Sequence, residues 1–497
     1  EIVGKNRGEP GYDTAAAYVA LQFEQMGLVP GGTDGWYQQV PLAAYQVTDE
    51  GAGLVIHGED GDTPLAYRDD FAVSGDPLRE STSIRAEVVY VGHGVHAPEK
   101  GYSDYAGVDV SGKIVAMFRD APAVLETTER AYYASSVHKM PAAVERGAVG
   151  VISLRSRESE EKYPWSKFRD RIGKQPSMTW LGENGDAASY YPELLGGASI
   201  AGHAAAKLFA SAPQTFEEVR DSIEAGEPIS FPLGVEVTIA QASGHRRLES
   251  PNVIGMIPGN DPELADEYIV YTAHLDHVGT LEGEGEDSIY NGAYDNAMGV
   301  ALMIESARAL IAAKPARSIL FVALTGEERG LLGSEYFAEY PTVPRESIVA
   351  NINIDMPLFL YSVADVIAFG AQHSSLILPA EAAATAEGFN LAPDPMPEEN
   401  FFVRSDQYSF VRKGIPALYL DVGTRAKDPH VDAEALYAEH MQTHYHEPSD
   451  DLSRPVDWDS ARRFARANAR VGYAVSTEEG RPRWNEGDFF GERFASP

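Results

Sequence analysis

The stretch EYIVYTAHLDHVG at residues 267–279 decides the fold class of this chain. It opens as a nearly continuous apolar run, which is typical of a strand buried on both faces of a parallel sheet. Two later stretches, SILFVALTGEERG at 318–330 and IVANINID at 348–355, repeat this arrangement. An amphipathic helical sequence, NAMGVALMIESARALIAA at 296–313, separates the first strand from the second. Such alternation predicts a mixed, mostly parallel α/β sheet with helices on both faces.

Each of these strands ends in residues of the types that bind metals or transfer protons. His274 and Asp276 end the first strand, Glu327 and Glu328 follow the second, and Asp355 follows the third. In open parallel sheets, functional residues gather just beyond the carboxyl ends of the strands. The pattern therefore brings a histidine and several carboxylates to one edge of the sheet.

Two loops add groups of the same kind. Asp295 lies in YNGAYDNAMG and His446 in THYHEPSDD. Taken singly, each signal has an ordinary explanation, because a lone strand-end His or Asp is usually structural and Asp295 is also placed to cap a helix. The pair Glu327-Glu328 is equally compatible with solvated charge at a helix start. Their coincidence at one edge favours a functional site.

The residue types fit a pair of zinc ions. Such pairs, about 3.5 to 4 Å apart, need a bridging carboxylate, terminal His and carboxylate ligands, and positions left open for water. A further carboxylate must take the proton from the bridging water. Adjacent Glu327 and Glu328 offer one ligand and one base. Asp276, two residues after His274, is placed to orient that imidazole through its distal N–H.

The charge and the lack of cysteine narrow the possible partners and ligands. The formal net charge is −35, from 75 acidic residues against 40 Lys and Arg, so we exclude nucleic acid as a partner. This charge attracts divalent metals and the ammonium end of a peptide, although solubility explains it equally well. Cysteine is absent, so any metal site uses His and carboxylates.

The sequence also bears on location. No stretch reaches the roughly 18 apolar residues that predict a transmembrane helix, so we expect no membrane-spanning segment. The chain opens at Glu1 without a methionine, as a product does after signal-peptide removal, although a cloning boundary would look the same. We expect a secreted or periplasmic protein.

A chain of 497 residues exceeds what one hydrophobic core usually accommodates, which predicts two domains. We assign residues 1–83, an N-terminal helix and connecting strands, to the catalytic domain together with 211–497. Residues 84–210 form a β-rich block without a cluster of metal-ligand character, and we interpret them as an inserted domain. Within this block, GVDVSGKIVAM at 107–117 and AAVERGAVGVISL at 142–154 resemble the protease-associated (PA) domain.

Six motifs follow one another between residues 252 and 452: AHLDHVG, NGAYDNAMGV, TGEERGLLGS, NINIDM, RSDQYSF and YHEPSDD. In kind and order they resemble the M28 family of metallopeptidases, which implies a zinc exopeptidase fold. The resemblance makes Glu327 the general base and Asp276 a carboxylate behind a ligand. It implies two zinc ions per chain, one held by His274 and Asp355, the other by Glu328 and His446, with Asp295 bridging them.

Further positions concern the substrate and the remaining histidines. Tyr445 matches a tyrosine that hydrogen-bonds the oxyanion in some members, although aromatic packing would explain it equally well. Arg404 matches an arginine that some members place near the substrate carbonyl, and otherwise forms a surface ion pair. Gln407 stands where we expect His or Tyr, so its role stays open. His277, three residues after His274, is not expected to face the same metal. Five histidines are interpreted as non-ligands: His277, His373, His430, His440 and His444.

These assignments predict hydrolysis of the amino-terminal bond of peptides, with Glu327 as general base on a metal-bridging water. A carboxypeptidase or dipeptidase on the same fold would need a basic pocket for the substrate carboxylate, for which Arg404 alone is available. A glutaminyl cyclase would use a single metal. A receptor-like relative without activity would have lost zinc ligands, whereas all five are present. Nothing in the residues specifies an oligomeric state.

Overall fold

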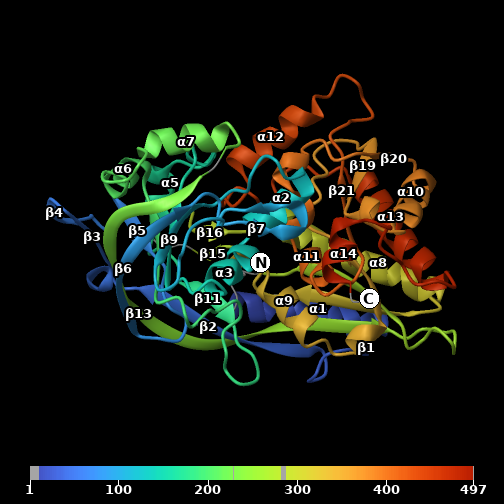
Figure 1. Cartoon of the computed structure of the whole chain (residues 1–497). Helices are drawn as coiled ribbons and strands as arrows, with labels where there is room; N and C mark the ends of the chain where they lie inside the picture. Colours follow the sequence, from blue (N-terminus) through green and yellow to red (C-terminus); the bar gives the residue numbers. More distant parts are fainter. Residues whose placement is uncertain (1–9, 228, 281–286, 496–497) are drawn as a thin grey trace. The chain divides into compact units, whose positions relative to one another are not determined.

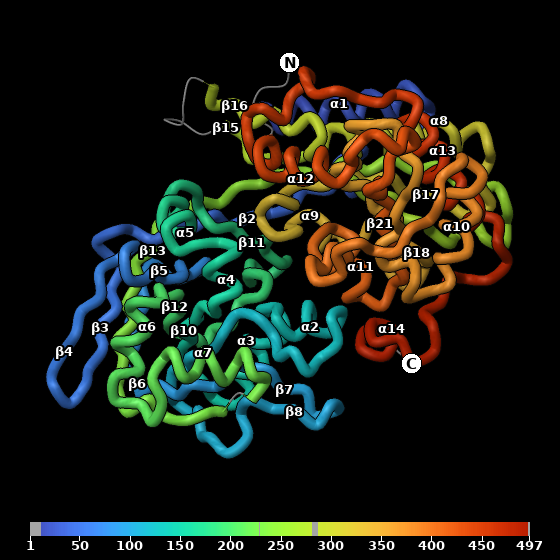
Figure 2. Tube along the Cα trace, turned by 90° about the horizontal axis from the view of Figure 1, so that it is seen from above, coloured from blue at the N-terminus to red at the C-terminus, as the bar shows by residue number. Residues whose placement is uncertain are grey.

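The computed structural model describes residues 10–227, 229–280 and 287–495. The chain divides into two compact units (Figure 1). Unit 1 joins the start of the chain, up to Pro41, to Glu249–Pro497, and unit 2 comprises Leu42–Leu248. Within unit 1, the blue start of the chain lies beside its yellow-green and red parts (Figure 2). Both ends of the sequence therefore build the same unit.

A mixed sheet forms the centre of unit 1. In spatial order its strands are β1 (Val29–Pro30), the end of β13 (Ser230–Ile257), β17 (Ser318–Leu324), β14 (Tyr268–His274), β18 (Ile348–Asn353), β21 (Ala417–Val422), β19 (Asp365–Phe369) and β20 (Asn390–Ala392). The central strands β17, β14, β18 and β21 are parallel, whereas β13 and β19 are antiparallel to their central neighbours. A separate hairpin pairs β15 (Gly279–Thr280) with β16 (Ile289–Tyr290). The predicted mostly parallel α/β sheet is confirmed.

Helices cover both faces of this sheet. One face carries α1 (Pro10–Met26), α8 (Gly299–Ala313), α10 (Ile377–Ala386) and α13 (Trp458–Thr477), and the other carries α9 (Leu332–Glu339) and α11 (Gln407–Val411); α12 (Ala433–Thr443) and α14 (Phe489–Phe494) complete the unit. Alternate residues of a strand face opposite layers. In β14, Ile269 and Tyr271 belong to the core beneath α8 and α13. Val270 instead packs with Phe337 of α9 and Phe410 of α11.

Unit 2 has its own sheet and helices. Its strands are β2 (Tyr37–Val47, which begins in unit 1), β3 (Gly53–Gly58), β4 (Gly61–Pro64), β5 (Phe71–Val73), β6 (Ser81–Val91), β7 (His96–Ala97), β8 (Tyr102–Ser103), β9 (Ile114–Phe118), β10 (Gly150–Leu154), β11 (Ser177–Trp180), β12 (Gly196–Ile200) and the first part of β13. Its helices are α2 (Thr127–Ala134), α3 (Ser136–Val144), α4 (Arg157–Lys162), α5 (Trp165–Arg171), α6 (Gly202–Leu208) and α7 (Phe216–Glu224). β6, β9, β10 and β12 run parallel.

The boundaries of unit 2 are wider than the block 84–210 that the sequence indicates. The unit starts at Leu42 because β3 pairs with β13 and β5 pairs with β12. It ends at Leu248 because the first part of β13 pairs with β6 along most of its length. The resemblance of this region to a PA domain stays a prediction.

One helical stretch among the described residues, 293–313, has the length and apolarity to cross a membrane. Half of it is buried inside the protein. It contains α8, which packs against α13 and β14 in the core of unit 1. This packing accounts for its apolar composition.

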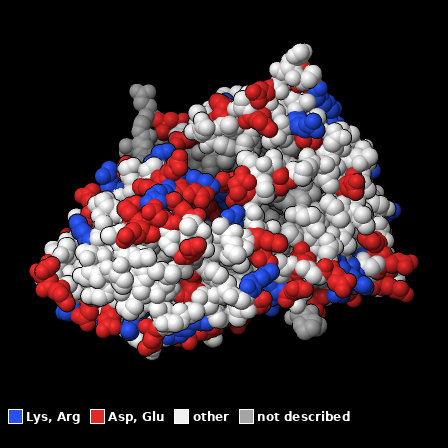
Figure 3. All heavy atoms as spheres, turned by 45° about the horizontal axis from the view of Figure 1, so that its top comes forward, with Lys and Arg blue, Asp and Glu red and all other residues white. Residues whose placement is uncertain are grey.

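The surface carries an excess of acid. Acidic side chains outnumber basic ones on the face drawn in Figure 3, in keeping with the net charge of −35. A field of this sign attracts cations and repels polyanions.

Candidate metal centre

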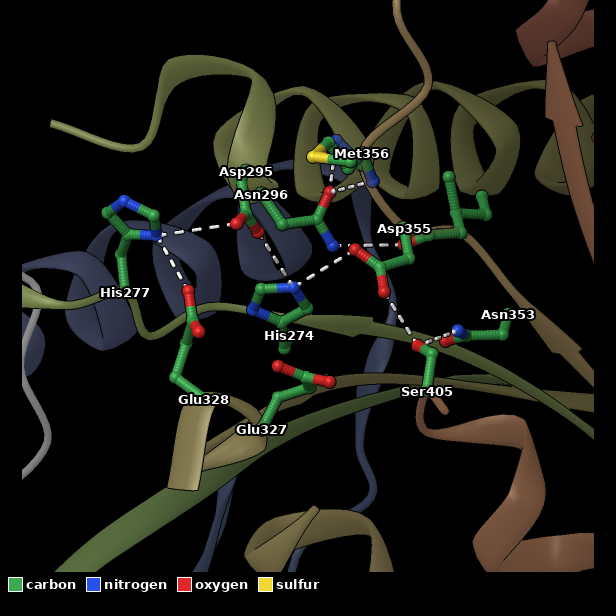
Figure 4. A network of polar contacts seen from close by, with 12 residues as sticks. His274, His277, Asp295, Asn296, Glu327, Glu328, Asn353, Asp355, Met356 and Ser405 are labelled. Carbon is green, nitrogen blue, oxygen red and sulfur yellow. Dashed lines mark hydrogen bonds and ion pairs between the residues drawn. The ribbon is translucent and has the colours of Figure 1, made fainter. Parts of the chain in front are cut away.

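Three neighbouring parallel strands of unit 1 end at one edge and present His or carboxylate groups there. His274 is the last residue of β14, and Asp355 follows β18. Glu327 and Glu328 lie in a short turn just after β17. Asp295 comes from the irregular segment that leads into α8. Figure 4 shows these side chains gathered around one point.

One half of the centre consists of His274, Asp295 and Asp355. The Nε2 atom of His274 lies 3.2 Å from Asp295 Oδ1 and 3.1 Å from Asp355 Oδ1. The Ser405 hydroxyl donates to the other oxygen of Asp355 at 2.6 Å, which fixes the orientation of this carboxylate. The three side chains offer donor atoms close enough together to hold one metal ion.

The other half is built on the second oxygen of Asp295. His446 Nε2 lies 3.1 Å from Asp295 Oδ2 and 3.0 Å from Glu328 Oε2. The backbone at His446 is left-handed, with φ of +58°, which is uncommon for a residue other than glycine. The two oxygens of Asp295 thus face two separate sets of His and carboxylate donors.

His277 belongs to this second half, although the sequence analysis interpreted it as a non-ligand. Its Nδ1 atom lies 2.8 Å from Glu328 Oε1 and 3.8 Å from Asp295 Oδ2. With these two carboxylates it forms a second group able to hold a metal ion. The spacing argument, that two histidines three residues apart do not face the same metal, agrees with this geometry, because His274 and His277 face opposite oxygens of Asp295. The spacing does not exclude His277 from the second half. The signal was present in the sequence, since His277 lies inside AHLDHVG.

Asp276 supports the centre in a different way from the one expected. The Nδ1 atom of His274 lies 3.2 Å from the backbone oxygen of Asp276 but 4.0 Å from its carboxylate. The Asp276 carboxylate instead accepts the backbone N–H of Glu327 at 3.0 Å. The main chain of Asp276 therefore orients the imidazole, and its side chain positions the turn that carries Glu327.

Asp450 is a supporting residue that the sequence patterns did not indicate. Its carboxylate is buried and accepts the backbone N–H groups of Tyr294 and Asp295, each at 3.0 Å. It thereby holds the segment that presents the shared carboxylate. Its position inside YHEPSDD was the available signal.

The electrostatic character of the centre is that of a cation site. Burial opposes a proton on His446, but Asp295 and Glu328 outweigh it and raise its pKa to about 10. Burial also opposes a proton on His274, whose pKa is nevertheless raised well above its usual value by carboxylates, Asp355 first. Protons on these rings balance carboxylate charge, a balance that a metal ion can take over. Among the described residues, no Lys or Arg forms an ion pair with Asp295, Glu327, Glu328 or Asp355.

The two adjacent glutamates differ in acidity. Burial raises the pKa of Glu327 well above its usual value, and neighbouring carboxylates raise it further. For Glu328, burial and Asp295 also raise the pKa, but contacts with His277 and His446 outweigh them and bring it down to about 2. Glu328 is therefore an anion suited to bind metal, whereas Glu327 readily takes up a proton.

A cavity of about 310 Å³ opens beside the centre and is lined in part by Tyr445 and Arg404. The Tyr445 ring stacks on His446 with 3.9 Å between centroids, and burial raises the pKa of its hydroxyl, which keeps it a donor. Arg404 is more than half exposed and lies 3.3 Å from a Glu399 carboxylate oxygen. Arg404 thus lines the cavity and forms the surface ion pair considered as its alternative.

Gln407, whose role the sequence left open, is buried behind the site. It accepts a hydrogen bond from Asn353 at 2.9 Å and donates one to the backbone of Phe402 at 2.7 Å. It therefore ties the end of β18 to the segment before α11. Among the described residues, the two groups able to hold a metal ion include none of the remaining histidines, His373, His430, His440 and His444.

Comparison with known proteins agrees with this geometry. Residues 252–472 match the model of peptidase family M28. The aminopeptidase NAALADL1 of Mus musculus is 37% identical over 141 residues, which cover 26% of this chain and 17% of that protein. The glutamate carboxypeptidase 2 homolog of Caenorhabditis elegans is 28% identical over 315 residues, covering 55% of this chain and 37% of that protein. The chain thus matches well under half of the length of either relative.

A solved structure resembles the whole chain. The aminopeptidase from Aneurinibacillus sp. strain AM-1 superposes with a TM-score of 0.51 at 20% sequence identity. The match covers 96% of this chain and 91% of that one. At this identity the likeness indicates a shared fold.

Proposed function

We propose that this chain, whose residues 252–472 belong to peptidase family M28, is a two-zinc exopeptidase that removes residues from the amino terminus of peptides. The observation that carries the proposal is the position of Asp295. Its Oδ1 lies 3.2 Å from His274 Nε2 and its Oδ2 lies 3.1 Å from His446 Nε2. A carboxylate with one oxygen toward each of two donor sets suits a bridge between two ions.

The donors fit zinc. They are imidazole nitrogens and carboxylate oxygens, which are established zinc ligands, and the chain has no cysteine. His274 and Asp355 would hold one ion, Glu328 and His446 the other, and Asp295 would be shared; His277 is a further donor on the second side. Bound zinc would polarise the substrate carbonyl and make the attacking water more acidic.

Glu327 is the proposed general base. Its backbone N–H donates to Asp276, which holds the turn in place, and its carboxylate belongs to neither donor set. The raised pKa lets it take a proton from the attacking water and return it to the leaving amine, as a base and acid of matched strength does. Tyr445, which lines the cavity and is kept protonated by burial, would donate to the oxyanion.

The charges around the cavity favour the amino terminus over the carboxyl terminus. Among the described residues of its lining, Arg404 is the single Lys or Arg, and Glu399 already pairs with that arginine. A carboxypeptidase would need a free cation there to bind the terminal carboxylate of the substrate. The carboxylates of the metal centre would instead attract the ammonium group at the amino terminus of a peptide. A cyclase that uses one metal would not account for the second set of His and carboxylate donors.

A panel of aminoacyl chromogenic amides, their N-acetylated forms and carboxyl-blocked peptides tests the proposal. We expect cleavage only where the amino terminus is free, loss of activity after exhaustive chelation and recovery with zinc. Cleavage that requires a free carboxyl terminus would establish the carboxypeptidase alternative. Full turnover after verified metal removal would exclude the mechanism.

A further inference from the structure

Besides groups of the metal centre, the cavity is lined largely by apolar and aromatic side chains: Met356, Met396, Phe401, Tyr437 and Met441. Two acidic residues that are neither proposed zinc ligands nor the proposed base also line it, Glu399 and Asp421. An acid in such surroundings calls for an explanation, since burying a carboxylate without a cation is costly.

Asp421 has no cationic partner in the part of the chain that the structure describes, where no Lys, Arg or His forms an ion pair with it. Its Oδ1 accepts the backbone N–H of Val422 at 2.7 Å. Its Oδ2 lies 3.2 Å from the Tyr419 hydroxyl, but that hydroxyl is closer, at 2.7 Å, to the backbone oxygen of Asp355. A hydroxyl has one proton, so the shorter contact takes it and Oδ2 keeps acceptor capacity.

The strand fixes the direction of this side chain. In β21, the alternating residues Leu418 and Leu420 are buried in the core, which places Tyr419 and Asp421 on the opposite side. Both line the cavity. Burial raises the pKa of Asp421 to about 8, as expected for a carboxyl group without a cation.

We propose that Asp421 selects peptides whose first side chain is cationic, a lysine or an arginine. This inference rests on the proposed aminopeptidase function, because it places the first residue of the substrate in this cavity. The ammonium or guanidinium group would reach Asp421, while the aliphatic stem would lie against the methionines. Glu399 is the other acid that lies away from the metal centre, but it is already paired with Arg404.

Two amides that differ in a single charge test the inference. Lysyl and norleucyl p-nitroanilides have stems of similar shape, and a charged hydrogen bond gives a preference of about 10- to 100-fold for lysine in kcat/KM. Asp421→Asn should bring this ratio close to one. Glu399→Gln, a matched control on an acid already paired with arginine, should change the ratio far less. Zinc content is measured for each variant.

The two proposals fail in different ways. If no aminoacyl amide is cleaved, the proposed function is wrong, and calorimetric binding of lysinamide and norleucinamide to the zinc-loaded protein still measures the preference. Equal or stronger binding of norleucinamide by the unmodified chain would overturn the role of Asp421. So would a lysine preference that persists in Asp421→Asn with full zinc content.

Discussion

The parallel strands of unit 1 and those of unit 2 both end in charged residues, but the two units balance that charge by different means. In unit 2, Asp120 follows β9, and the buried Lys139 ammonium donates to the backbone oxygens of Phe118, Arg119 and Asp120 at 2.8, 2.8 and 2.7 Å. Arg155, just after β10, pairs with Glu160 at 2.6 Å. In unit 1, the carboxylates of the corresponding edge form ion pairs with histidines alone, as far as the described residues go.

This difference separates a structural network from a binding site. Burial alone raises the pKa of Asp120, but His93, Ser156 and Lys139 outweigh it and lower it to about 2, so the group is an anion stabilised by neighbours within unit 2. Among the described residues, no group of side chains able to hold a metal ion lies at this edge of unit 2. The imidazoles of unit 1 are metal ligands once deprotonated, so a metal ion can take the place of their protons.

The largest effect should follow from removing the carboxylate that both donor sets share. Asp295→Asn should weaken both zinc ions by more than about 100-fold, because even the outer partners of metal ligands are worth 10- to 100-fold. Asp355→Asn should mainly release one ion. Metal analysis after dialysis against graded zinc buffers distinguishes the two. If Asp295→Asn loses one ion only, Asp295 does not bridge.

A smaller but sharper effect should separate the adjacent glutamates. Glu327→Gln should retain both metals and lose about 100- to 10,000-fold in turnover, the usual range for a general base. Glu328→Gln should lose activity in proportion to one zinc, because an anionic ligand is removed. Metal content and kinetics are measured on both variants. The opposite pattern, with zinc lost from Glu327→Gln alone, would reverse the two assignments.

A weaker effect on zinc affinity should follow from changing Asp450, which holds the segment that carries the shared carboxylate. Asp450→Asn replaces an oxygen that accepts the N–H of Asp295, which should lower zinc affinity by about 10- to 100-fold. The neighbouring Asp451→Asn provides a matched control, because that carboxylate accepts from the nearby backbone N–H of Ser453 and not from the segment that carries Asp295. Zinc titration of both variants measures the difference. Equal affinities would mean that Asp450 does not position the bridge.

The sequence was sufficient to predict the central sheet and the residues at the ends of its strands. A buried parallel strand has a clear apolar pattern, and the carboxyl ends of such strands lie together at one edge of the sheet. The role of His277 could not be predicted, because it depends on the path of the loop after β14. The sequence also could not predict that the backbone oxygen of Asp276 contacts His274 while its carboxylate accepts the N–H of Glu327. Both oxygens are hydrogen-bond acceptors, and only the folded backbone decides which partner each one meets.

Two other features depend on pairings that are distant in sequence. The limits of unit 2 follow from β13, a single strand that continues from one unit into the other. The exposure of Asp421 to the cavity depends on the register of β21 against β18 and β19. In the sequence ALYLDV this residue resembles any polar position at a strand end.

A change in unit 2 should have the smallest effect on zinc binding. Lys139→Met should leave three backbone oxygens without the ammonium that donates to them, at a cost of about 1 to 3 kcal/mol in the stability of unit 2. Zinc content should not change, because no residue of the metal centre belongs to unit 2. Urea unfolding followed by limited proteolysis measures the stability, and Lys167→Met, which alters an exposed lysine in α5, is the control. If Lys139→Met costs no more stability than Lys167→Met, the cation is not what holds this edge together. If it instead releases zinc under native conditions, the two edges are coupled, and the contrast between a satisfied network and a binding site would not explain their difference.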